Sequence, residues 1–443
     1  MRLSNTGLES NKIQNLNETY PAQDLLMQTN QIVQYAAGIY GYNNVPLKVK
    51  ENIEKVIKTV LNKYGCIEIS LPTLQPENIW QESGRWDKYI EEGTMMTIET
   101  EKGKFGMAPT AEEAVSVFVR NKVKSYKSLP ITLYQIGEKF RNEIRPRGFL
   151  MRGKSFPMMD AYSFNLNEED LVKSYENMRN AYIEIFERLG LEVLPVAADS
   201  GAIGGKKSEE FMLISELGED TILVDKKTGK AVNTEILERE DHKEYLKEEY
   251  GIEDVSALEE KRAIELGHIF QLGTKYSESM GVNYTNGEGK DALFYMGCYG
   301  IGVSRTLATI YENSAVEGKD GKVSGITLPI NVAPYLLQII PKIENEEKMA
   351  EAEKLYSDLN ELEIGAIIDD RAKATFGAKM KDCKVLGTPY MAVIGDKVEA
   401  GHAEVENIAT GEKHVMKQSE LVEKLGTLKE LVRQGVFKKL EEV

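Results

Sequence analysis

Residues 131–164 read ITLYQIGEKFRNEIRPRGFLMRGKSFPMMDAYSF, and this stretch decides the fold. Ile131–Phe140 and Phe156–Phe164 are strand-like, and the loop between them is rich in Pro, Gly and Arg, which predicts a long antiparallel hairpin. From Arg120 to Lys154 there are ten Lys or Arg and two acids, a local charge of +8. Arginine binds phosphate or carboxylate through two parallel hydrogen bonds. The arginines of this loop therefore indicate an anion-binding site. On charge alone, a basic surface hairpin is the alternative.

The whole chain is acidic, with 443 residues and a net charge of -16. This length predicts two to four domains, and the charge argues against a protein that coats DNA or an anionic membrane. No apolar stretch suits a signal peptide or a membrane span, so we expect a cytoplasmic protein. Cys66, Cys298 and Cys383 are far apart in the sequence, which argues against a disulfide framework and against structural zinc.

The spacing of apolar residues predicts helices and strands before and after the hairpin in the sequence. We expect a helix over 47–64 followed by an edge or interface strand that ends at Pro72, and a capped helix over 167–190. Residues 235–262 are strongly charged and predict a helical, solvated surface excursion. A boundary falls near 329–334. Beyond it a compact α/β unit is expected, with strands at 336–340, 366–369 and 390–394 and helices at 344–362 and from 419.

Familiar phosphate loops are missing, since Gly201–Ser208 lacks the P-loop spacing and no strand precedes a G-x-G-x-x-G motif. Instead, Phe140–Phe156 resembles motif 2 of class II aminoacyl-tRNA synthetases, Met296–Arg305 (MGCYGIGVSR) resembles motif 3, and the segment ending at Pro72 resembles motif 1. The similarity runs from Met1 to about residue 425. Four further segments resemble prolyl-tRNA synthetases in particular: WQESGRW (80–86), APTAEE (108–113), DAYSF (160–164) and GHIFQLG (267–273).

This resemblance implies an α+β fold. It has a class II catalytic domain over 1–332, an antiparallel sheet flanked by helices, and a C-terminal α/β anticodon-binding domain over 333–443. It implies ATP-dependent activation of L-proline to prolyl-adenylate, with Mg²⁺ and without zinc, and transfer to the 3′ end of tRNA(Pro). It also implies a homodimer formed through the region that ends at Pro72. The alternatives are a paralogue that activates proline or binds tRNA without charging it, and a ligase of the same subclass for threonine, glycine or histidine.

The resemblance further assigns roles in an ATP site. Arg141 would contact the α-phosphate and the proline carboxylate, and Arg152 and Arg305 would contact the γ-phosphate. Arg141 and Arg305 are the expected catalytic residues. Glu143 would contact the adenine edge and Phe156 would stack on adenine. For Phe156, simple core packing is the alternative.

Other site residues follow in the same way. Glu265 and His268 would lie near ATP, with Glu265 as a candidate Mg²⁺ ligand, although His268 suits a core histidine equally well. Thr110 and Glu112 would hold the ammonium group of proline, with Phe270 and Cys298 lining the ring pocket as apolar walls. In the C-terminal domain, Arg371, Lys379 and Lys381 are candidate anticodon contacts, with a solvated rim as the alternative.

Two further expectations concern what departs from the family. Many bacterial members carry an editing domain between motifs 2 and 3, whereas only the short excursion 225–266 fills that place here. We therefore expect no editing in cis, with mischarged tRNA left to a separate trans-editing protein or to none. Ser155, Met159 and Glu209 replace residues usual in the family, and we expect them near the ATP or proline site.

Overall fold

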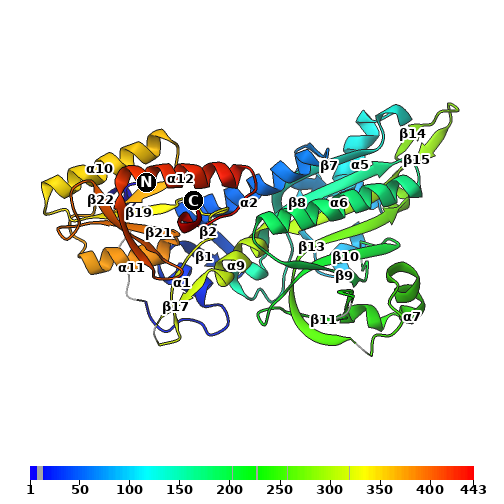
Figure 1. The fold of residues 1–443 in the computed structure, drawn as a ribbon. Coiled ribbons are helices and arrows are strands. Elements are labelled where there is room, and N and C mark those ends of the chain that lie inside the picture. Colours follow the sequence, from blue (N-terminus) through cyan, green and yellow to red (C-terminus); the bar gives the residue numbers. More distant parts are fainter. Residues whose placement is uncertain (7–12, 202, 226–227, 257, 319) are drawn as a thin grey trace. The chain divides into compact units, whose positions relative to one another are not determined.

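The computed structural model describes residues 1–443 apart from 7–12, 202, 226–227, 257 and 319 (Figure 1). The chain divides into two compact units. The nine-stranded unit comprises Ala36–Ile39 and Glu54–Thr306. The five-stranded unit comprises Met1–Tyr35, Tyr40–Ile53 and Leu307–Val443. The first residues thus group with the C-terminal part, whereas the sequence predicts a split at 332. No helix in the described part of the chain is long and apolar enough to cross a bilayer.

A mostly antiparallel sheet forms the centre of the nine-stranded unit and confirms the predicted hairpin. Ile131 pairs with Phe164 and Phe140 with Ser155. The edge strand pairs parallel to its neighbour and covers only Ile67–Glu68, shorter than the predicted strand. The strand order is β10 (Lys207–Ile214), β9 (Val193–Ala198), β12 (Ala231–Asn233), β11 (Asp220–Val224), β13 (Glu259–Gly273), β16 (Tyr295–Gly302), β8 (Ser155–Asn165), β7 (Ile131–Phe140) and β3 (Ile67–Glu68), with β10 also pairing with β13.

The long helix α6 (Glu168–Arg188) covers one face of this sheet and packs against β8, β13 and β16 (Figure 1). The side chain of Asn167 accepts a hydrogen bond from the backbone N–H of Asp170 and caps the helix, as the sequence predicts. Its buried stripe includes Tyr182, whose ring lies 4.9 Å from that of Phe211 on β10. Residues at helical spacing therefore seal this face of the sheet.

The opposite face carries shorter elements that enclose the candidate site. Trp80, Trp86 and Tyr89 pack there into one core with Phe270 and Cys298. The elements are the three-stranded sheet β4 (Leu74–Pro76), β6 (Gly103–Met107) and β5 (Met96–Thr100), helices α3 (Glu77–Glu82), α4 (Trp86–Glu91), α5 (Glu112–Lys122) and α8 (Lys275–Ser279), and the hairpin β14 (Asn283–Thr285) and β15 (Asp291–Leu293).

The excursion expected over 235–262 is only partly helical. Short helical turns cover Thr234–Glu238 and His242–Tyr250, but Glu259–Arg262 already belongs to the central strand β13, so the prediction of a helix there is wrong. The segment is not merely a solvated face either. Its apolar residues Ile236, Leu246 and Ile252 pack on Ala197 and Val232, a pattern that the many charged residues concealed.

The five-stranded unit contains the predicted C-terminal α/β arrangement. Its sheet has the order β20 (Ala366–Ile368), β19 (Leu337–Pro341), β21 (Tyr390–Ile394), β22 (His402–Asn407) and β23 (Lys413–Lys417). Helices α10 (Glu346–Glu361) and α12 (Gln418–Arg433) confirm the predicted helices, and α11 (Phe376–Leu386) is an additional one. The remaining elements are α1 (Pro21–Gln28), β1 (Ile32–Ala36), β2 (Ile39–Tyr42), α2 (Asn44–Lys63), α9 (Val303–Asn313), β17 (Ala315–Glu317) and β18 (Val323–Ile326).

Candidate active site

A cavity of about 500 Å³ lies within the nine-stranded unit, on the face of the sheet opposite α6. Strand register builds its floor, since paired residues on neighbouring antiparallel strands share a face. One such row runs from β10 to β7 through Glu210, His268, Gly300, Asp160 and Gln135. Of this row, His268, Gly300 and Asp160 line the cavity although they are distant in sequence.

A second row lies two residues along each strand and is less polar. Phe270 pairs with Cys298, which pairs with Tyr162. Phe270 and Cys298 are both buried, and burial raises the pKa of the Cys298 thiol well above its usual range. The protonated thiol is a small apolar wall, as the sequence analysis expects, and not an activated nucleophile.

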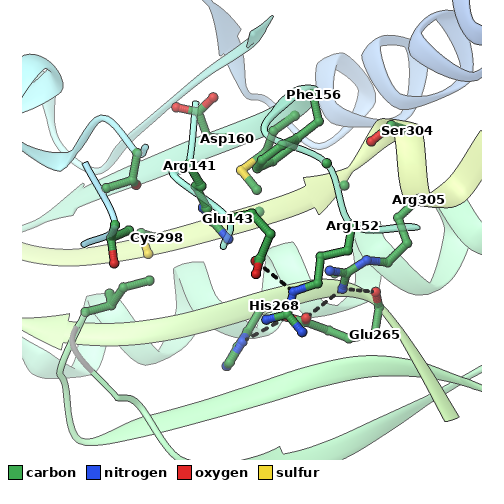
Figure 2. A pocket seen from close by; sticks show the side chains of 18 of the residues that line it. Arg141, Glu143, Arg152, Phe156, Asp160, Glu265, His268, Cys298, Ser304 and Arg305 are labelled. Carbon is green, nitrogen blue, oxygen red and sulfur yellow. Dashed lines mark hydrogen bonds and ion pairs between the residues drawn. The ribbon is translucent and has the colours of Figure 1, made fainter. Parts of the chain in front are cut away.

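Arg141 lies where β7 ends, with its guanidinium 5.3 Å from the centre of the Phe156 ring (Figure 2). Its backbone N–H donates to the carbonyl of Lys154 across the hairpin. Among the residues that the structure describes, no carboxylate forms an ion pair with Arg141, and burial lowers its pKa. Glu265 and Glu112 favour the charged form of Arg141 from a distance, and with no direct ion pair its guanidinium donors suit an anion in the cavity.

Two further arginines reach the same cavity, each held by carboxylates (Figure 2). Arg305 donates to Glu265 Oε2 at 2.8 Å and to the carbonyl of Glu265 at 2.7 Å. Arg152 donates to Glu143 at 2.8 Å and lies 3.4 Å from Glu219. Burial raises the pKa of Glu143, but the hydrogen bond and charge of Arg152, the backbone N–H of Arg145 and the charge of Arg147 together outweigh it, so the net shift is downward. Both arginines are thus positioned before any ligand arrives.

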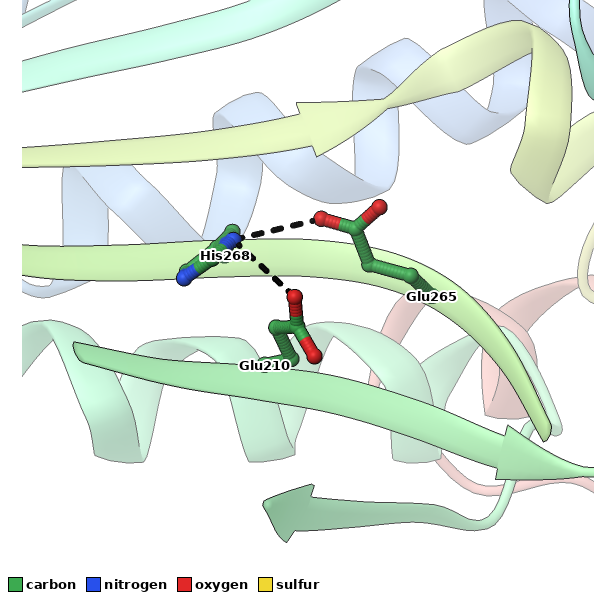
Figure 3. Close-up of side chains that lie close together, drawn as sticks. All are labelled: Glu210, Glu265 and His268. Carbon is green, nitrogen blue, oxygen red and sulfur yellow. Dashed lines mark ion pairs between the residues drawn. The ribbon is translucent and has the colours of Figure 1, made fainter. Parts of the chain in front are cut away.

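Glu210, Glu265 and His268 form a compact group whose ligand atoms lie within 4.8 Å of one another (Figure 3). His268 Nδ1 is 3.3 Å from Glu265 and 3.5 Å from Glu210. Burial raises the pKa of Glu210 to about 7. Glu265 is more exposed, and although burial alone would raise its pKa, His268 and Arg305 lower it. Two carboxylates on one imidazole suit a hard divalent cation, which prefers oxygen ligands. His268 also stacks on Phe270 with ring centres 3.9 Å apart.

Thr110 and Glu112 lie at the other end of the cavity, where α5 begins. The hydroxyl of Thr110 donates to Glu112 Oε2 at 2.7 Å, and Arg85 donates to the same oxygen at 3.1 Å. Glu112 is buried, yet Arg85 and Thr110 outweigh the burial and lower its pKa. The structure therefore places a carboxylate and a hydroxyl together, as the sequence analysis expects, and adds an arginine behind them.

A buried ion pair supports the floor of the cavity. Lys139 Nζ donates to Asp160 at 2.5 Å, and Gln135 and Tyr162 each donate to the other Asp160 oxygen at 3.0 Å. The hydroxyl of Tyr162 in turn accepts from the backbone N–H of Ala111 at 3.0 Å. This chain of hydrogen bonds connects the hairpin strands to the residue that precedes Glu112.

We predict that Lys139→Met lowers the free energy of unfolding by about 3–5 kcal/mol, because it leaves the Asp160 carboxylate buried without its cation. Lys104→Met is the matched control. Lys104 is half exposed beside Glu99, and its loss should change the free energy by less than about 0.5 kcal/mol. Urea denaturation measures both variants. Equal, small effects would show that the buried pair does not support the floor.

The three departures from the family do not themselves line the cavity, although each adjoins a residue of the site, namely Phe156, Asp160 or Glu210, so the expectation that they lie near the site stays a prediction. Met159 neighbours Asp160 on β8, and since side chains alternate along a strand it points to the opposite face, where it is fully buried. Glu209 accepts hydrogen bonds from Tyr175 and Arg179 of α6. Ser155 donates to Glu138. Met159 and Glu209 thus lie on the α6 side of the sheet.

Several residues that lie outside the cavity lining but support its walls gave no signal in the sequence. Gly38, at the tip of the β1–β2 hairpin, accepts a hydrogen bond from the backbone N–H of Lys154 at 2.8 Å. Its φ is +78°, and a Cβ there would lie 2.9 Å from Lys154 N and from Pro146. Only glycine fits this close approach, which holds the motif 2 loop. Glu210 and Glu219 were also missed, since isolated acids in an acidic chain give no signal.

In the five-stranded unit, the structure gathers two of the three predicted RNA contacts around Asp369. Arg371 donates to Asp369 at 2.6 Å and to Asp382 at 2.8 Å. Lys379 is buried, and its Nζ donates to the carbonyl of Asp369 at 3.0 Å. Lys381, by contrast, is exposed. An RNA contact for all three stays a prediction.

Comparison with known proteins agrees with this geometry. The model of the tRNA synthetase class II core domain (G, H, P, S and T) matches residues 95–314, and that of an anticodon binding domain matches 337–428. The chain is 36% identical to a proline--tRNA ligase of Sulfurimonas denitrificans over 96% of this chain and 99% of that protein. It is 39% identical to one of Rickettsia bellii, over 88% and 90% of the two chains.

Among solved structures, prolyl-tRNA synthetase from Cryptosporidium parvum complexed with L-proline and AMP has a similar fold. The TM-score is 0.72 at 16% identity, over 96% of this chain and 81% of that one. The likeness in fold and the identity over nearly the whole chain agree with the arginine-lined cavity described above. The chain belongs to the prolyl-tRNA synthetase family of class II aminoacyl-tRNA synthetases.

Proposed function

We propose that this protein activates L-proline with ATP and transfers the prolyl group to the 3′ end of tRNA(Pro). An oxygen of the proline carboxylate attacks the α-phosphorus of ATP, and the bond to the β-phosphate breaks to release pyrophosphate. The terminal 3′-hydroxyl then attacks the carbonyl carbon of prolyl-adenylate and AMP leaves. The observation that carries the proposal is Arg141, which forms no ion pair with a carboxylate of the described residues, lies 5.3 Å from the Phe156 ring centre and lines the same cavity as Thr110 and Glu112.

Each step needs stabilised negative charge and no protein nucleophile. Arg141 would bridge the α-phosphate and the proline carboxylate, since it lines the cavity together with Phe156, Thr110 and Glu112. Arg152 and Arg305 would bind the γ-phosphate through positions that their carboxylate partners already fix. Phe156 would stack on adenine. Glu143 would accept a hydrogen bond from the edge of the adenine ring. This hydrogen bond would partly replace the one that Glu143 now accepts from Arg152.

A divalent cation fits the group of Glu210, Glu265 and His268 because carboxylate oxygens dominate it. Glu265 is the proposed Mg²⁺ ligand, with Glu210 beside it. When bound together with ATP, Mg²⁺ would neutralise charge on the phosphates. We propose that the protein works without zinc.

The Thr110–Glu112 pair would bind the secondary ammonium group of proline, and Phe270 and Cys298 would enclose its ring. A carboxylate and a hydroxyl match the two N–H donors of that group. The apolar wall would bury the ring carbons of proline, and each buried methylene contributes roughly 0.8 kcal/mol of binding free energy.

An ATP–pyrophosphate exchange panel tests the amino-acid assignment. Proline should support exchange, while threonine, glycine and histidine at the same concentration should not. Exchange driven by one of those three instead would assign the protein to another ligase of the subclass.

The remaining parts of the proposal concern tRNA, assembly and location. The five-stranded unit would contribute an anticodon-binding domain, set within 333–443, in which Arg371, Lys379 and Lys381 face RNA. The catalytic domain would comprise 1–332 and pair with a second copy through the region that ends at Pro72. Because charged tRNA is consumed by ribosomes, we propose that the protein works in the cytoplasm.

We also predict that this chain does not edit. Among the described residues between β12 and β13, Ile236, Leu246 and Ile252 pack as a small cluster on β9 and β12. A smaller substrate is rejected by lost contacts alone by only about 10–200-fold per methylene, so alanine at high concentration should be attached to tRNA(Pro). Purified protein with labelled alanine should accumulate alanyl-tRNA, which a trans-editing protein would clear. Rapid deacylation by this chain alone would contradict the prediction.

A further inference from the structure

Behind Glu112 lies a buried charge cluster that the reaction itself does not use. Arg85, 3% exposed, directs Nη1 toward Glu112 and Glu113 at 3.1 Å each. Both carboxylates are buried, and Ser83 donates to Glu113 at 2.6 Å. Glu112 lines the cavity, whereas Glu113 and Arg85 do not. Arg85 also lies outside residues 95–314, which match the class II core model.

Aromatic rings shield this cluster from water. The Arg85 guanidinium lies 5.1 Å from the ring centre of Trp80, 4.4 Å from that of Tyr89 and 5.3 Å from that of Tyr276. Charges in such surroundings interact far more strongly than charges at a surface. The charge balance among the three ionisable groups therefore acts directly on any ion that reaches Glu112.

We propose that Glu113 is a specificity-determining residue that neutralises Arg85, so that Glu112 keeps a full negative charge for a cationic amine in the cavity. The inference rests on the proposed function, in which Thr110 and Glu112 hold the ammonium group of proline. With Glu113 ionised, the cluster carries one net negative charge, and a bound ammonium group brings it to zero. Without the Glu113 charge, Arg85 would cancel Glu112, and the ammonium group would leave a buried positive charge.

The position of Glu113 supports this role. Glu112 and Glu113 occupy the first turn of α5, where the helix dipole favours negative charge. Burial raises the pKa of Glu113, and a cation arriving at Glu112 favours its ionised form. Glu113 can therefore respond to the charge of the ligand without touching it.

The test compares two ligands of the same shape in the purified full chain. Proline carries a ring ammonium, and tetrahydrofuran-2-carboxylate carries a ring oxygen in its place. The KM of proline and the inhibition constant of the analogue are measured in ATP–pyrophosphate exchange. Glu113→Gln should raise the KM of proline by about tenfold and leave the inhibition constant of the analogue unchanged or lower.

Two further variants separate charge from structure. Arg85→Gln/Glu113→Gln removes one positive and one negative charge. The ratio of the proline KM to the inhibition constant of the analogue should therefore return to within about threefold of its value in the unaltered protein. Glu82→Gln is the matched control. It makes the same substitution on α3, where Glu82 pairs with Arg120 at 2.7 Å, and it should leave the ratio unchanged.

An equal rise of the proline KM and of the analogue's inhibition constant in Glu113→Gln would overturn the inference. A ratio of KM to inhibition constant in the double variant that is as high as in Glu113→Gln would overturn it as well. If Glu113→Gln does not fold, the double variant decides alone, because it removes Arg85 together with one of its two carboxylate partners and so keeps the net charge of the cluster. A ratio of KM to inhibition constant in the double variant close to that of the unaltered protein supports the inference, and a ratio that is clearly higher overturns it. Failure of the proposed function is distinct, since the unaltered protein would then show no proline-dependent exchange.

Discussion

Arg141→Ala should lower proline-dependent ATP–pyrophosphate exchange by about 10³-fold, the upper range for removing one preorganised donor to developing charge. Arg141 is the sheltered cation of the cavity that has no carboxylate partner among the described residues, so its charge is available to the α-phosphate and the proline carboxylate. The loss should appear in kcat, because negative charge on the α-phosphate grows in the transition state. Initial exchange rates over a range of ATP and proline concentrations measure it.

The control for this variant is Arg145→Ala, on the same loop. Arg145 is exposed, and its removal should change tRNA-free exchange by less than about threefold, since it lies outside the cavity lining. Thermal melting should show both variants folded, because no described ion pair is lost with Arg141. Comparable activity in the two variants would contradict the assignment of Arg141 as the central cation.

Glu112→Gln should raise the KM of proline by about 10²-fold while the KM of ATP stays nearly unchanged. The ammonium group of proline would lose its ion pair with Glu112. Arg85 would remain nearby, with Glu113 as its remaining carboxylate partner. The amide keeps the shape of the side chain, so the effect reports charge. Exchange kinetics with each substrate varied in turn measure the two constants.

Thr110→Val is the milder companion to Glu112→Gln. It removes one hydrogen bond to Glu112 and should raise the KM of proline by about tenfold. If the KM of ATP rose as much as that of proline in Glu112→Gln, the variant would have disturbed the whole cavity. That result would contradict a proline subsite at this end of it.

Local patterns predicted much of the fold. The hairpin Ile131–Phe164 and the helix capped by Asn167 are set by strand composition and by a side-chain cap, both of which are properties of neighbouring residues. The site residues came from motif resemblance. The structure brings those of the nine-stranded unit into one cavity.

What local patterns could not supply is pairing across the sheet. Glu210 lies beside His268 only because β10 and β13 pair in one register, and a shift by one residue would place it on the α6 face. The same alternation removes Met159 from the site although it adjoins Asp160 in sequence. The charge run 235–262 also misled, because a few apolar residues among many acids were enough to form a small core.

Aminoacylation is the most direct test of the central claim. Purified full-length protein is incubated with ATP, Mg²⁺, labelled proline and a tRNA(Pro) transcript, and acid-precipitable label is followed with time. We predict that the label rises to a plateau near one prolyl group per tRNA, and that it does not rise without ATP or with a tRNA for another amino acid. Proline-dependent pyrophosphate exchange without any label on tRNA(Pro) would contradict the account and identify a proline-activating paralogue instead.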